Sequence, residues 1–184
     1  MTPRLQSLLF ASTLLVIADM AGAESHDHGH DHGHDHGHEH GAAMLEVNMT
    51  TPVVSVWMTV PGGDFFGDLP EDQHTQRTAE DLVAGPDMIL KLPGAAGCSV
   101  LTSSVDITEI KEGDHAGHSD VTVKFGLTCT NPDAITSLEP RVFDSFPAVT
   151  SVDLTVAGPG FSLTVEVPAP GGPVWVRPLV MPTS

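Results

Sequence analysis

Alternation of apolar and polar residues predicts most of the regular structure in this chain. The clearest case is residues 121–128, where Val, Val, Phe and Leu occupy every second position. A period of two is typical of a β-strand with one buried face. The same alternation, or enrichment in Val, Ile and Thr, predicts strands at 45–49, 53–60, 99–110, 152–156 and 161–167, and a terminal strand at 174–177.

Two short helices are predicted between these strands. The first follows Pro70, has acidic residues in its first turn, and ends at the Gly-Pro pair 85–86. The second has Asn131 as its N-cap and Pro132 at its first helical position, and it ends near Leu138. This order of elements is not a βαβ repeat. We therefore expect an α+β domain with a mainly antiparallel sheet.

Residues 1–23 have the three parts of a secretory signal peptide. Arg4 provides a positive region, residues 8–17 are apolar, and residues 21–23 form a small-residue cleavage pattern. The apolar run is shorter than the ~20 residues that span a membrane, although a retained anchor is the alternative. We expect cleavage near Ala23, export to the periplasm and no membrane span in the mature chain.

The two cysteines, Cys98 and Cys129, are predicted to form a disulfide. An even cysteine count in an exported chain usually means a disulfide. Cys98 precedes one predicted strand and Cys129 ends another, with the polar loop 111–120 between them. We therefore expect an antiparallel hairpin closed at its open end by the disulfide. A metal-binding or redox-active cysteine pair is the alternative, but the Cys-x-x-Cys spacing is absent.

Composition and charge exclude several classes of protein. The chain has 184 residues, which fits one ordinary domain, and we place that domain at 42–184. Its formal net charge of −17 argues against nucleic-acid binding and favours the attraction of divalent cations. No zinc-protease motif, nucleophile elbow or phosphate loop occurs, so we assign no catalytic residue and do not expect an enzyme.

Residues 24–41 form a low-complexity tail in which histidine alternates with acidic residues and glycine. Imidazole is the commonest protein ligand for Zn²⁺ and also binds Cu²⁺ and Ni²⁺, which are the alternatives. The glycines disfavour a helix, so we expect a disordered tail with interchangeable sites of modest affinity. With three or four ligands per ion, its histidines hold about two Zn²⁺ ions. These histidines are His26, His28, His30, His32, His34, His36, His38 and His40.

The predicted hairpin loop contains a second group of candidate ligands. His115 and His118 are candidate metal ligands, and Asp114 and Asp120 are further candidates. They can form a partial site or complete one with the tail, and a solvated polar turn is the alternative. His74 lies in the first predicted helix, where an ordinary surface histidine is the favoured interpretation and a metal ligand the alternative.

Two other features have structural interpretations. Met44, Met49 and Met58 suggest soft ligation of Cu(I), but they lie in predicted strands, where core packing is the better explanation. An acidic stretch between residues 64 and 81 is interpreted as solvated surface. It consists of Asp64, Asp68, Glu71, Asp72, Glu80 and Asp81.

The chain resembles the zinc-regulated, His-rich periplasmic proteins of Gram-negative bacteria, the ZrgA-type group. The matching parts are the His-rich segment, LPGAAGC at 92–98, the Thr-Cys strand end at 128–129 and RVFDSFP at 141–147. The resemblance implies a periplasmic accessory protein that captures or buffers Zn²⁺ for an ABC-type importer, with the importer's binding protein as a candidate partner. It also implies that relatives carry further histidines in the hairpin loop.

This chain departs from the family pattern before the first predicted helix. Relatives carry a Gly-Phe-Glu-His stretch there, whereas this chain has GDLP at 67–70, so His74 is only a nearby substitute.

Two other functions also stay open from the sequence. One is sequestration or detoxification of copper or nickel, and the other is a structural interaction domain with an incidental tail.

Overall fold

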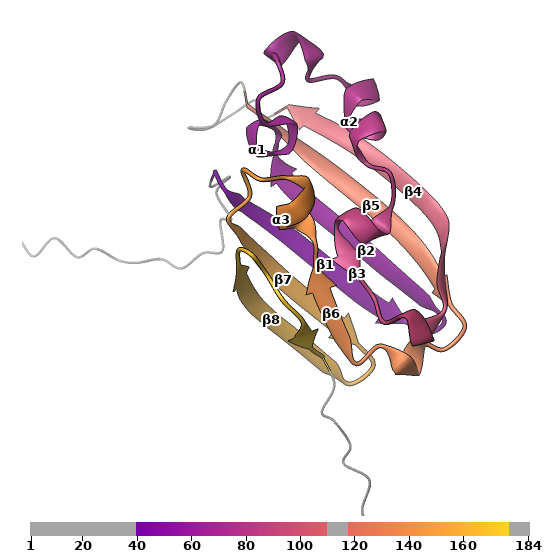
Figure 1. Cartoon of the computed structure of the whole chain (residues 1–184). Helices are drawn as coiled ribbons and strands as arrows, with labels where there is room; N and C mark the ends of the chain where they lie inside the picture. The colour runs from indigo at the N-terminus through magenta and orange to yellow at the C-terminus, as the bar shows by residue number, and fades with distance from the viewer. Residues whose placement is uncertain (1–39, 110–117, 177–184) are drawn as a thin grey trace, which may run out of the picture. The chain divides into compact units, whose positions relative to one another are not determined.

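The computed structural model describes residues 40–109 and 118–176. The predicted signal peptide and the tail up to Glu39 lie outside the described residues, as do Asp114 and His115. Within the described ranges the chain forms nine strands and three short α-helices (Figure 1). The predicted α+β class is confirmed.

Six long strands form one sheet, and they correspond to the six predicted strands. Neighbouring strands are antiparallel except β1 and β7, which run parallel. The sequence predicted mainly antiparallel pairing and did not anticipate this parallel pair. The order across the sheet is β4 (Cys98–Glu109), β5 (Ser119–Cys129), β2 (Val53–Pro61), β1 (Ala42–Thr50), β7 (Ser151–Gly158) and β8 (Phe161–Pro168).

One face of this sheet carries the apolar core. Strand alternation sends every second side chain to this face, and each apolar side chain buried there contributes roughly 1.5–3 kcal/mol. Met49 and Met58 are buried on it, which confirms core packing rather than copper ligation for these two. One row of directly opposed residues crosses all six strands: Val105, Val123, Met58, Leu45, Leu154 and Val165.

Short elements cover the apolar face of the sheet (Figure 1). These elements contribute Phe65, Phe66 and Leu138 to the same core cluster, and Phe146, directly after α3, joins them. The helices are α1 (Gly62–Phe66), α2 (Gln76–Leu82) and α3 (Val142–Ser145), and the short strands are β3 (Leu90–Lys91), β6 (Ser137–Pro140) and β9 (Val174–Trp175).

The first predicted helix is divided into two. A 3-10 turn at Glu71–Gln73 is followed by α2, and Thr75 interrupts the helix with an extended backbone (φ −117°, ψ 157°). The Thr75 hydroxyl accepts a hydrogen bond from the backbone N–H of Thr78 at 3.2 Å, so it caps α2. The cap explains why α2 begins later than the sequence predicted.

The prediction of a second helix, from Asn131 to near Leu138, is wrong. Only a 3-10 turn forms, at Pro132–Ala134, and Leu138 lies in strand β6 instead. Leu138 is fully buried, and β6 pairs with both β3 and β9. Local helix signals were therefore outweighed by tertiary pairing. The predicted terminal strand is present as β9, whereas α1 and α3 were not predicted.

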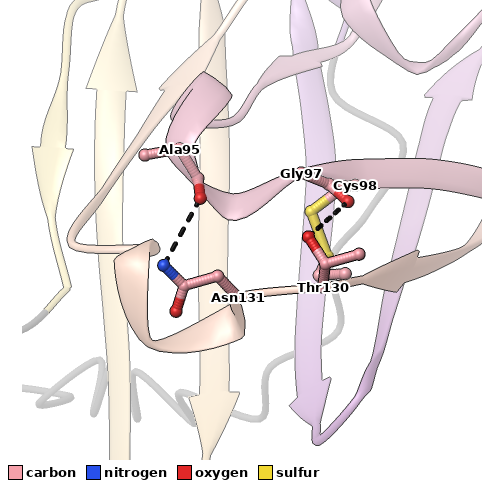
Figure 2. The surroundings of a disulfide bond; sticks show 6 residues. Ala95, Gly97, Cys98, Thr130 and Asn131 are labelled. Carbon is pink, nitrogen blue, oxygen red and sulfur yellow. Dashed lines mark hydrogen bonds between the residues drawn. A yellow bond between two sulfur atoms is a disulfide. The ribbon is translucent and has the colours of Figure 1, made fainter.

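The predicted disulfide between Cys98 and Cys129 is confirmed. The two residues are directly opposed at the end of the β4–β5 ladder. Figure 2 shows the turns beside the bond, where Asn131 Nδ2 donates to the Ala95 carbonyl at 3.4 Å. Gly97 has a φ of +58°, and a Cβ there would collide with the Thr130 hydroxyl. Glycine therefore allows the close approach of the two turns.

The outer strand β4 contains a β-bulge. Its register against β5 shifts by one residue between Val100 and Thr102, which leaves Leu101 without a directly opposed residue. Leu101 is 60% exposed and Val100 is 48% exposed. Beyond the bulge the ladder continues to the pair Glu109–Ser119.

Replacing both cysteines, in a C98A/C129A variant, is expected to lower the free energy of unfolding by about 3–4 kcal/mol, because the unfolded chain gains loop entropy. Urea unfolding followed by circular dichroism measures this change. The matched control is Ser99→Ala at an exposed neighbouring position, with an expected change within about 0.5 kcal/mol. Equal stability of the double variant and the control would contradict the prediction.

Candidate metal centre

Two predicted ligands, His40 and His118, lie beside each other in the structure. His40 is close to the start of β1 and His118 directly precedes β5. Their ring centroids are 5.9 Å apart. Both residues are exposed, so an ion from solvent can reach them. The end of the tail and the end of the hairpin loop therefore meet at one end of the sheet.

Asp64 is the third functional group at this end of the sheet. It lies in α1, which directly follows β2, the strand between β1 and β5. One carboxylate oxygen, Oδ2, accepts a hydrogen bond from the backbone N–H of Gly41 at 2.6 Å. The other, Oδ1, is 3.7 Å from His40 Nδ1. This carboxylate therefore fixes the backbone next to His40 and faces its ring.

Burial distinguishes Asp64 from the other acidic residues of its stretch. Asp64 is 8% exposed and is the only charged residue that the described part of the chain buries. Asp68 nearby is exposed, as the sequence interpretation expected for the whole stretch. That interpretation is wrong for Asp64. The available signal was its position before Phe65 and Phe66, two residues that enter the core.

Gly41 joins the tail to the sheet. Its carbonyl accepts hydrogen bonds from the backbone N–H groups of Thr150 and Ser151, at 2.7 Å and 3.0 Å. It has a φ of +85°, and a Cβ there would lie 2.8 Å from the Thr150 hydroxyl. The position therefore requires glycine, and it fixes the point at which His40 leaves the domain.

Comparison with known families gives the class of this chain. A family model described as the ZrgA family of zinc uptake proteins matches residues 37–170, more than half of the chain. The chain belongs to the ZrgA family. A comparison of this ZrgA chain with curated proteins found no match.

The other predicted ligands of this ZrgA chain that the structure describes, Asp120 and His74, lie in two places. Asp120 is opposite Pro61 in the β2–β5 ladder, at the same end of the sheet as His118. His74 has a structural role among the described residues. Its Nε2 is 3.0 Å from the Leu69 carbonyl, and its ring is stacked on Phe66 with 4.4 Å between centroids. His74 is therefore a half-buried histidine whose ring packs against α1 through Phe66.

The described residues of the ZrgA domain do not complete a metal site by themselves. No group of three or more His, Cys, Asp or Glu side chains within 40–109 and 118–176 has the arrangement needed to hold a metal ion. His40, His118 and the adjacent Asp64 carboxylate lie near one another at this end of the sheet, and the two histidines are the candidate ligands there. The longest helix in these ranges is α2, with seven residues, and no described helix is a candidate membrane span.

Replacing Asp64 by Ala is expected to lower the free energy of unfolding by about 1–3 kcal/mol, because the buried N–H of Gly41 loses its acceptor. Chemical denaturation measures the loss, and faster hydrogen exchange of the Gly41 amide locates it. Asp68→Ala is the matched control, with an expected change within about 0.5 kcal/mol. The assignment would be refuted by equal effects of the two substitutions.

Proposed function

We propose that this protein is a periplasmic accessory protein that captures Zn²⁺ and passes it to an ABC-type zinc importer. Membership of the ZrgA zinc uptake family is the observation that carries this proposal. The histidines of 24–41 are the main ligands, and the hairpin-loop histidines add to them. Zn²⁺ is cargo in this proposal and not a fixed structural ion.

The ligand chemistry supports transfer rather than permanent storage. Imidazole binds zinc in its neutral form, so zinc affinity falls as the pH decreases towards the ordinary imidazole pKa of about 6.5. Catalytic and transfer sites leave coordination positions open, whereas structural zinc sites have four protein ligands. His40 and His118 leave such positions open for a ligand from a receiving protein.

The disulfide supports a compartment outside the cytoplasm. Disulfides such as Cys98–Cys129 persist in oxidising compartments, including the bacterial periplasm, and are rare in the cytosol. The signal-like pattern of residues 1–23 agrees with export. A periplasmic protein meets zinc before the importer does, so its ligands can raise the zinc concentration at the importer's binding protein.

Replacing seven tail histidines by Asn is expected to reduce the zinc stoichiometry by about two ions per chain. The substituted residues run from His26 to His38, whereas His40 and Gly41 are kept because Gly41 is hydrogen-bonded into the sheet. Isothermal titration calorimetry of the mature chain at neutral pH gives the stoichiometry.

The control for this experiment changes the acidic tail residues and keeps every histidine. Replacing Asp27, Asp31 and Asp35 by Asn and Glu39 by Gln is expected to preserve the stoichiometry, with a smaller change in affinity. If the seven-histidine variant bound as much zinc as the natural chain, the tail would not be the capture region.

Deleting the gene is expected to slow growth in zinc-limited medium, and added Zn²⁺ is expected to restore it. Deletion in a strain that already lacks the importer should add no further defect, because both act on one uptake route. Normal growth under zinc limitation would contradict the proposal. Sensitivity of the deletion strain to excess copper or nickel alone would favour sequestration of those metals instead. Imidazole also binds both of these ions, and it binds Cu²⁺ more tightly than Zn²⁺.

A further inference from the structure

We infer that His40 and His118 bind one Zn²⁺ ion together, at a site that links the tail to the hairpin loop, with Asp64 as the residue that positions His40. This inference deepens the proposed function and rests on it. It distinguishes one site on the folded domain, the junction site, from the interchangeable sites of the tail.

The separation of the two rings is the first argument. Zinc binds imidazole nitrogen at about 2.0–2.1 Å, so two histidines on one ion must have their rings side by side. The centroids of His40 and His118 are 5.9 Å apart and the rings are inclined by 55°. Both residues are exposed, and the His40 side chain is 63% exposed, so core packing does not prevent the small ring rotations that would bring one nitrogen of each ring to one ion.

The position of Asp64 is the second argument. Histidine ligands commonly donate their second ring N–H to a carboxylate, which fixes the tautomer and strengthens the ligand. Asp64 Oδ1 lies 3.7 Å from His40 Nδ1, and a movement of about half an ångström makes this a hydrogen bond. A proton on Nδ1 leaves Nε2 of His40 for zinc. The Gly41 N–H holds Asp64 Oδ2, so the carboxylate is already oriented.

The scaffold is the third argument. His40, Asp64 and His118 are attached to three adjacent strands of one sheet, in the order β5-β2-β1. Their backbones are ordered before zinc arrives, whereas an extended tail must lose conformational entropy to surround an ion. We therefore expect the junction site to lose less conformational entropy on binding zinc than a tail site does. The further coordination positions are available to water, or to a ligand from a tail or a receiving protein.

The test uses the full mature chain with the other histidines of the tail and the hairpin loop removed. In this background, the seven tail histidines from His26 to His38 and also His115 are replaced by Asn. We expect one Zn²⁺ per chain, measured by competition with a chromogenic zinc chelator. Adding His40→Asn or His118→Asn should weaken zinc binding at least tenfold. Adding His74→Asn is the matched control and should leave zinc binding unchanged.

A separate experiment tests whether Asp64 positions the ring of His40. Asp64→Asn in the same background should weaken zinc binding by about 10-fold to 100-fold, as the loss of such a partner typically does. NMR of the imidazole nitrogens should show His40 protonated at Nδ1 with Asp64 present, and no such preference in the variant. A structural role alone would not change the tautomer. His118→Asn, on an exposed side chain, keeps the test valid if Asp64→Asn fails to fold.

Two outcomes would overturn the inference. One is a background variant that binds no zinc. The other is one bound ion that His40→Asn and His118→Asn leave unaffected. Neither outcome bears on the proposed function, because zinc capture by the tail is measured separately, as the ions lost on replacing the seven tail histidines of the natural chain.

Discussion

Burial of one face of the six-stranded sheet is the constraint on which the domain depends. The row from Val105 to Val165 crosses every strand, and the short elements of the covering layer exist because that face must be shielded from water. Those elements are too short to be stable alone, since isolated helices shorter than ~12–15 residues are marginal in water. The sheet therefore determines where α1 lies, and α1 carries Asp64.

The same sheet brings distant parts of the chain to one place. His40, Asp64 and His118 are far apart in sequence, and they meet because β1, β2 and β5 are neighbours. A charged group is buried here only where a backbone N–H and an imidazole face it. This arrangement follows the rule that buried charges have polar partners. The domain is therefore more than a carrier for the tail, since it also provides an ordered place where the tail begins.

The sequence was sufficient for the long strands and the disulfide, because a period of two and the cysteine positions are local signals. It was insufficient for Leu138, where a local helix signal competed with strand pairing that only the tertiary structure reveals. It allowed the loop histidines to complete a site with the tail, but it could not identify His40 and His118 as the neighbouring pair, because their proximity depends on the order of strands. Asp64 was missed for a related reason: its burial comes from α1 folding onto the sheet, and neighbouring acids such as Asp68 are exposed.

The β-bulge in β4 has a consequence for how copies of this protein meet. β4 is an edge strand, and an unpaired edge can add strands from other molecules and lead to aggregation. The irregularity falls at Val100 and Leu101, where this edge is both apolar and exposed. A continuous ladder with a second molecule is interrupted there, and the net charge of −17 adds repulsion between copies. The bulge and the negative charge therefore both oppose association of two copies of this protein through β4.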